Sequence, residues 1–93
     1  MLTFTATLTV KTGQEAEFER IMHVTVPKVR EEPGNYAYVL HRSTDNPRVF
    51  MVYEAYEDAE ALESHRAHLK EMGIDLRHLL EGPPVLTFYD KLL

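Results

Sequence analysis

Apolar residues and threonines alternate without interruption at the start of the chain. The even positions from Leu2 to Val10 are all apolar, and the odd positions from Thr3 to Thr9 are all threonine. A period of two over nine residues, with β-branched side chains on one side, is typical of a β-strand. We therefore expect a strand over residues 2–10, whose threonine side meets either water or a partner sheet.

A helix-start signature follows this strand. The segment Thr12–Glu15 has the S/T-x-x-E spacing of a capping box, in which Thr12 and Glu15 reciprocally satisfy free amide groups. Apolar residues at helical spacing continue the helix, and Pro27 removes one hydrogen bond and is expected to kink its last third. The segment Glu31–Asn35 contains a proline and a glycine, so it predicts the end of the helix and a turn.

The middle of the chain predicts an antiparallel hairpin. Residues 35–42 and residues 48–56 both read as strands, and the turn-forming segment Ser43–Pro47 separates them. Side chains on both faces of this hairpin are largely apolar. In most antiparallel sheets one face is polar because it meets water, so this hairpin needs a partner on each face.

The remainder of the chain predicts a second helix and a last strand. Helical spacing covers residues 57–72, a short third helix is expected over residues 76–80, and Val85–Tyr89 reads as a strand. The resulting order, β-α-β-β-α-β, is that of the ferredoxin-like split βαβ fold. We therefore expect an α+β protein with a four-stranded antiparallel sheet, forming a single domain over residues 1–93.

In this fold both helices cover the same face of the sheet, which leaves the other face open. Exposing an apolar side chain there forgoes roughly 1.5–3 kcal/mol of burial free energy. Large exposed apolar patches usually mark interaction surfaces. We therefore predict a homodimer in which two sheets pack face to face.

Composition narrows the classes of partner. The net charge of the chain is −5, which argues against nucleic acid because phosphate binding needs a basic surface. No apolar run approaches the roughly 20 residues of a membrane span, and the alternating N-terminus does not resemble a signal peptide, so we expect a cytoplasmic protein. The chain has no cysteine and no dinucleotide, nucleotide or nucleophile-elbow motif. We therefore expect no cofactor.

The candidate chemistry lies in the third strand and the helix after it. Glu54 and Tyr56 share one strand face inside an apolar run, where a carboxylate needs a partner. Leu62, His65 and Leu69 fall at helical spacing, so the histidine sits in the apolar stripe that faces the sheet. Glu54, Tyr56 and His65 are therefore expected to converge between sheet and helix.

Each of these residues has a catalytic and a structural interpretation. With an ordinary pKa near 6.5, His65 suits proton removal from a phenol or an α-hydroxy ketone, and Glu54 is the candidate that orients it. His65 can equally be a core histidine, and Glu54 a buried polar group satisfied by a neighbour. The predicted substrate-binding residues, which can also be simple packing residues, are Tyr56, Tyr38, Phe50 and Leu69.

A metal site is a further option at this helix. His65 and His68 have a spacing that can hold a metal ion. The sequence identifies no third ligand nearby, so we expect no metal. The acidic residues around positions 57–63 are expected to complement the dipole at the helix N-terminus.

Several of these residues also match a known family. The matching segments are Glu32–Asn35, Tyr38, Asn46–Pro47, Phe50, Tyr53–Tyr56, Glu60–Leu62 and His65. Together they resemble the antibiotic biosynthesis monooxygenase family of dimeric α+β barrels, and the Y-E-A-Y-x5-L-x2-H pattern is the most specific part. The chain looks most like the small quinol-monooxygenase branch, and it is also similar to the autoinducer-2 phosphate isomerase of the same superfamily.

This resemblance implies a homodimer built sheet to sheet, with a pocket between the sheet and the helices. It also implies oxidation without metal or flavin, because an electron-rich phenolic substrate activates oxygen. Haem-degrading relatives carry an asparagine on strand one and a tryptophan after strand three, where this chain has Ala6 and Tyr56, so haem degradation is not expected. The second histidine motif of many relatives is replaced here by Arg66–Lys70.

Three functional hypotheses follow. The first is a cofactor-independent monooxygenase acting on a quinol or a similar small aromatic substrate, with His65 as the base. The second is an isomerase that uses the same base on a small hydroxy-ketone, for which a phosphate would need a cation such as Arg42, Lys28 or Lys70. The third is a small-molecule-binding dimer without catalysis.

Overall fold

The computed structural model describes residues 1–93, and its elements follow the expected order. They are β1 (Leu2–Thr9), α1 (Glu15–Arg30), β2 (Asn35–Arg42), β3 (Val49–Tyr56), α2 (Ala59–Glu71), the short 3₁₀ helix η1 (Arg77–Leu79) and β4 (Val85–Tyr89). The predicted strands therefore agree with the observed ones to within one residue. The predicted third helix is a single 3₁₀ turn.

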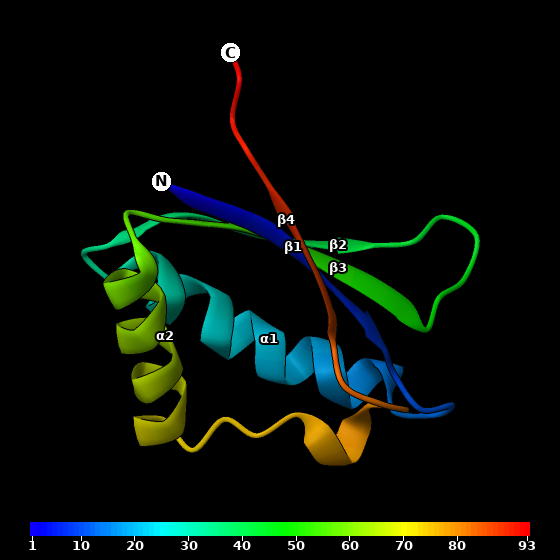
Figure 1. Ribbon diagram of the computed structural model, residues 1–93. Helices are drawn as coiled ribbons and strands as arrows, with labels where there is room; N and C mark the ends of the chain where they lie inside the picture. The colour runs from blue at the N-terminus through cyan, green and yellow to red at the C-terminus, as the bar shows by residue number, and fades with distance from the viewer.

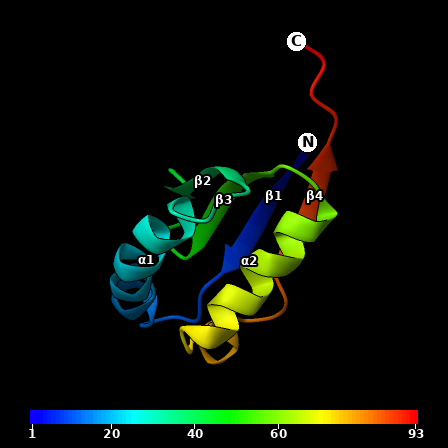
Figure 2. The same ribbon diagram turned by 90° about the vertical axis from the view of Figure 1, so that its left-hand side faces the viewer.

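The four strands form one antiparallel sheet in the order β2-β3-β1-β4. Both α-helices and η1 lie on the same side of it (Figure 1). Helix α1 lies beside β2, whereas α2 crosses the end of the sheet where β1 begins (Figure 2). This arrangement confirms the predicted ferredoxin-like α+β fold.

The core lies between the helices and the inner face of the sheet, in two parts. The larger part is held by α1, the strands and η1, and the rings of Phe18 and Phe50 are 4.6 Å apart within it. The smaller part lies near α2 and contains Phe4, Tyr56 and Leu62. The buried polar side chains of the candidate site adjoin this smaller part.

The two helices start differently, and the predicted capping box is wrong. Helix α1 begins at Glu15 after Gln14, and no side chain caps it. The Glu15 carboxylate does accept a hydrogen bond from the Gly13 amide, at 2.7 Å. Gly13 adopts a left-handed turn with φ of 88°, which takes Thr12 away from the cap position. Helix α2 instead has a side-chain cap, because Asp58 accepts a hydrogen bond from Ala61 at 2.8 Å.

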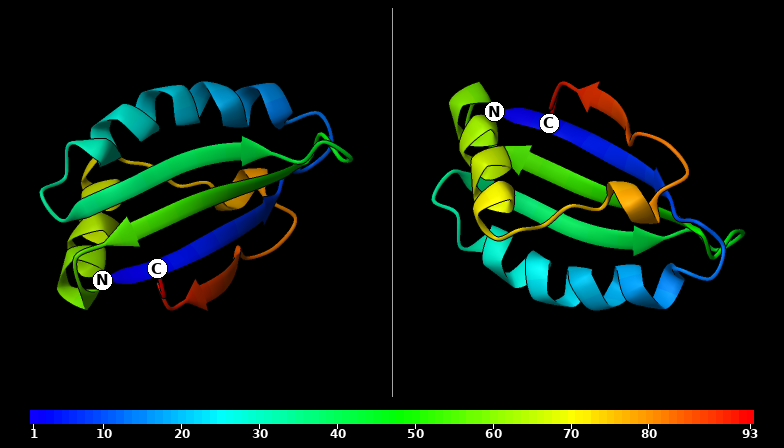
Figure 3. Two further views of the ribbon diagram at one scale, coloured as in Figure 1. Left: turned by 90° about the horizontal axis from the view of Figure 1, so that it is seen from above. Right: turned by 90° about the horizontal axis from the view of Figure 1, so that it is seen from below.

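No helix covers the outer face of the sheet (Figure 3). The strand register and the sequence place no acidic, lysine or arginine side chain on this face. Its exposed large apolar side chains come from three strands: Val39, Tyr53, Val85 and Tyr89. An uncharged face is unusual in a chain of which 27% of the residues are charged. No helix of the protein is both long enough and apolar enough to span a membrane.

The loop between α1 and β2 packs closely against α2. A Cβ atom added to Gly34 would lie 2.5 Å from the Cβ atom of Ala61, so this contact requires glycine. The Gly34 carbonyl also accepts a hydrogen bond from the Glu57 amide, at 2.9 Å. The loop is therefore fixed to α2 and to the end of β3.

We predict that Gly34→Ala destabilises the protein by about 1–3 kcal/mol, because the added methyl group overpacks this contact. Gly82→Ala is the matched control, since a Cβ atom there meets no atom within 4 Å. Urea denaturation of both variants measures the difference. Equal stabilities for the two variants would contradict the tight packing described here.

Candidate functional site

Strand β3 places Glu54 and Tyr56 on the inner face of the sheet, as predicted. The Tyr56 hydroxyl donates a hydrogen bond of 2.7 Å to Oε1 of Glu54. Burial raises the pKa of Glu54 to about 7, and it raises the pKa values of Tyr56 and Tyr38 well above their usual range. Near neutral pH both tyrosines are therefore protonated, whereas Glu54 is divided between its acid and its carboxylate.

Helix α2 presents His65 to this pair, and only 4% of the histidine is exposed. Its ring lies 5.1 Å from the Tyr56 ring and 5.5 Å from the Tyr38 ring, measured between centroids. Burial lowers the pKa of His65 below its usual value because the charged imidazolium loses hydration. The resting imidazole is therefore neutral at pH 7.

The partner that orients His65 is Glu32, which follows α1. His65 Nδ1 lies 3.1 Å from both Glu32 carboxylate oxygens, whereas Nε2 is 3.9 Å from Oε1 of Glu54, too far for a direct hydrogen bond. The expected orienting contact from Glu54 is therefore absent. Because a carboxylate accepts hydrogen bonds, the proton of neutral His65 lies on Nδ1 and the lone pair on Nε2.

Sequence reasoning did not assign a role to Glu32, which precedes His65 by 33 residues. No local spacing relates a residue at the end of one helix to a residue inside the next. The only signal was its place in the Glu32–Asn35 segment that resembles the family. The same carboxylate also accepts a hydrogen bond from His68 Nδ1 at 2.7 Å, so His68 joins the cluster as well.

The four predicted substrate-binding residues lie at different distances from this cluster. Tyr38 and Tyr56 pack on the His65 ring. Phe50 is 1% exposed and packs against Phe18 in the larger core, and Leu69 also contacts that core. The structure brings the two tyrosines to His65 and leaves Phe50 no surface on which to contact a ligand directly.

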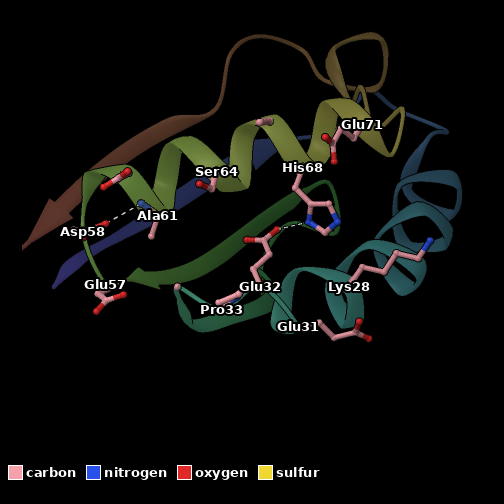
Figure 4. Close-up of a pocket in the computed structure, with 13 residues that line it drawn as sticks. Lys28, Glu31, Glu32, Pro33, Glu57, Asp58, Ala61, Ser64, His68 and Glu71 are labelled. Carbon is pink, nitrogen blue, oxygen red and sulfur yellow. Dashed lines mark hydrogen bonds and ion pairs between the residues drawn. The ribbon is translucent and has the colours of Figure 1, made fainter.

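A groove of about 840 Å³ opens between the end of α1 and α2, and Figure 4 shows Glu32 and His68 pointing toward each other within it. Only two of its 13 lining residues are hydrophobic. Its six carboxylate residues are Glu31, Glu32, Glu57, Asp58, Glu60 and Glu71, against the two basic residues Lys28 and His68. The cluster around His65 therefore lies behind an acidic opening.

The arrangement suits acid–base chemistry. A neutral imidazole whose Nδ1 proton is bound to a carboxylate can accept a proton at Nε2, and Glu54 can donate or accept near pH 7. Both histidine Nδ1 atoms bond to Glu32, and no group of three or more acidic or histidine side chains is arranged to hold a metal ion. The site thus offers one oriented base and one buried acid.

The raised pKa of Glu54 makes folding stability depend on pH. In the unfolded chain a glutamate has a pKa of about 4.3, so between about pH 4.3 and 7 the folded protein binds more protons and loses stability as the pH rises. The glutamine side chain in Glu54→Gln carries no charge at any pH, so this variant does not lose folding stability for this reason as the pH rises. Its stability relative to the wild type should rise by on the order of 3 kcal/mol from pH 4.5 to pH 8.

Urea denaturation at several pH values checks this prediction. Glu31→Gln is the control because Glu31 is exposed. Parallel pH dependences for the wild type and Glu54→Gln would contradict a raised pKa at Glu54.

Comparison with known proteins places the chain in a family. Residues 1–70 match the family model described as antibiotic biosynthesis monooxygenase. A Caulobacter crescentus CB15 protein named after this family is 31% identical, with a TM-score of 0.79 over 99% of this chain and 90% of that chain. For PA3566 from Pseudomonas aeruginosa the identity is 28% and the TM-score 0.87, over 99% and 94% of the two chains. No curated protein matches the chain significantly. The chain belongs to the antibiotic biosynthesis monooxygenase family.

Proposed function

We propose that the protein is a cofactor-independent monooxygenase that oxidises a quinol or a similar small phenol. The observation that carries this proposal is the orientation of His65, whose Nδ1 is bound by Glu32 at 3.1 Å. Burial also keeps the imidazole neutral. A neutral, oriented imidazole is the group needed to take a proton from a phenol.

The first step is proton transfer from the substrate hydroxyl to Nε2 of His65. The resulting phenolate is electron-rich and reacts with molecular oxygen at a ring carbon, and a carbon–oxygen bond forms. Loss of water from this adduct leaves one oxygen atom on the ring. Overall, one quinol and one O₂ give one hydroxylated quinone and one water, so the substrate supplies all four electrons.

The distance between His65 and Glu54 would let both side chains hydrogen-bond to one hydroxyl group of a bound substrate. Nε2 and the Glu54 Oε1 atom are 3.9 Å apart, so a single oxygen atom at about 2.8 Å from each can hydrogen-bond to both. Tyr56 holds Glu54 in place. Because His65 is 4% exposed, substrate entry requires side chains at the groove to move.

The isomerase hypothesis is less well supported when its substrate carries a phosphate. Of the three candidate cations, Arg42 pairs with Glu19, Lys70 does not line the groove, and Lys28 lines it among six carboxylates. Such an acidic groove repels an anion. It favours an uncharged substrate such as a quinol.

We also propose that the protein is a homodimer through the outer face of its sheet. Support comes from the open, uncharged face with its exposed Val39, Tyr53, Val85 and Tyr89. Two copies related by a two-fold axis can pack such a face against itself. Burying it removes apolar surface from water at about 25 cal/mol per Å².

The catalytic proposal predicts oxygen uptake by the purified protein with simple hydroquinones or naphthoquinols. His65→Ala should lower this uptake at least tenfold because the base is lost. His23→Ala is the control, since His23 is exposed on α1. Uptake no faster than the uncatalysed reaction, from folded wild-type protein, would contradict the proposal and favour an isomerase or a binding protein.

The dimer proposal predicts that Tyr53→Lys shifts the protein toward monomer, because it places a charge inside the interface. Val24→Lys, on the exposed surface of α1, should leave the oligomeric state unchanged. Sedimentation velocity over a range of concentrations measures both. A monomeric wild-type protein, or a Tyr53→Lys variant as dimeric as the wild type, would exclude this interface.

A further inference from the structure

One carboxylate, that of Glu32, lies between two imidazoles. Its oxygens are 3.1 Å from Nδ1 of His65, and one of them is 2.7 Å from Nδ1 of His68. The side chains differ in exposure, at 12% for Glu32, 5% for His65 and 33% for His68. The cluster therefore runs from the buried base to a histidine at the groove.

We propose that His68 is a positioning residue for His65, acting through the Glu32 carboxylate that the two histidines share. His68 holds Glu32 by its shorter hydrogen bond, and its charge determines how strongly Glu32 stabilises protonated His65. The functional meaning of this coupling rests on the proposed role of His65 as the base. The coupling itself is a property of the three side chains.

The coupling follows from charge balance. One carboxylate can neutralise only one imidazolium. When His68 is neutral, the negative charge of Glu32 is available to stabilise His65 after it has taken a proton. When His68 is protonated, it takes up much of that charge and also repels a second positive charge at His65.

The other charged groups near the cluster do not replace this interaction. Glu54 of β3 is too distant from Nε2 for a hydrogen bond. Burial lowers the pKa of His65, Glu32 raises it, and His68 and Arg66 of α2 make smaller contributions that lower it. The hydroxyls of Tyr38 and Tyr56, from β2 and β3, remain uncharged at neutral pH.

At the groove, the charged residues near His68 come from both helices. Lys28 lies on α1, Glu31 follows α1, and Glu71 lies on α2. None of them bonds to either histidine, whereas Glu32 contacts both. Glu32 is therefore the charged side chain that links the two imidazoles by hydrogen bonds.

The test is an NMR titration of the histidine side chains, which gives the pKa and the tautomer of each ring. His68→Gln keeps a donor for Glu32 but removes the positive charge, so the pKa of His65 should rise by at least about half a unit. Glu32→Gln removes the negative charge and should lower the pKa of His65. His23→Gln, at an exposed histidine outside the cluster, should leave it unchanged.

The result that overturns the proposal is a His65 pKa that is the same in the wild type and His68→Gln, or a His65 proton found on Nε2 in the wild type. If His68→Gln does not fold, the Glu32→Gln titration decides, because a His65 pKa that does not fall excludes the shared carboxylate. These measurements need no substrate, so they can distinguish failure of the coupling from failure of the proposed monooxygenase function. With an active quinol, the acid limb of kcat/KM should move upward with the pKa of His65 in His68→Gln.

Discussion

The contact between Glu32 and His65 is the interaction on which the candidate site depends. It joins the loop between α1 and β2 to helix α2. Both side chains are largely buried, and a buried ionisable group is costly unless it is paired. The close approach of Gly34 to Ala61 holds the Glu32 loop against α2. The position of Glu32 beside His65 therefore depends on the packing of this loop against α2.

Burial shifts the pKa values of the two ionisable groups of the site in opposite directions. Glu54 has lost hydration inside the sheet, so its pKa is raised to about 7. His65 has lost hydration too, but for an imidazole the same loss lowers the pKa. The outcome is a neutral base beside a carboxyl group that is readily protonated. Such separation of environments is how enzymes assign acid and base roles at neutral pH.

Much of the fold could be predicted because its signals are local. The alternation of residues 2–10 and the stripe containing Leu62 and His65 each depend on neighbours in the sequence. The capping box at Thr12 failed because the turn at Gly13, with its left-handed φ, intervenes. The S/T-x-x-E spacing alone does not show at which residue the helix begins.

The partners of the candidate site were harder to predict. Glu54, Tyr56 and His65 were expected together, because strand and helix periodicities both point inward. The contact to Glu32 spans 33 residues and depends on how the loop after α1 meets α2, which no periodicity encodes. For the same reason, Phe50 was expected at the substrate and instead fills the core against Phe18. Two residues on the same face of a strand can lie at different distances from the site, and the alternation pattern does not distinguish them.

The most direct measurement of the central claim is a crystal structure with a quinol bound under anaerobic conditions. We predict a substrate oxygen within about 3 Å of Nε2 of His65, with Nδ1 still bound to Glu32 and the Glu54 carboxyl group on the other side of the oxygen. A quinol bound elsewhere, with no oxygen near His65, would contradict the assignment of this histidine as the base.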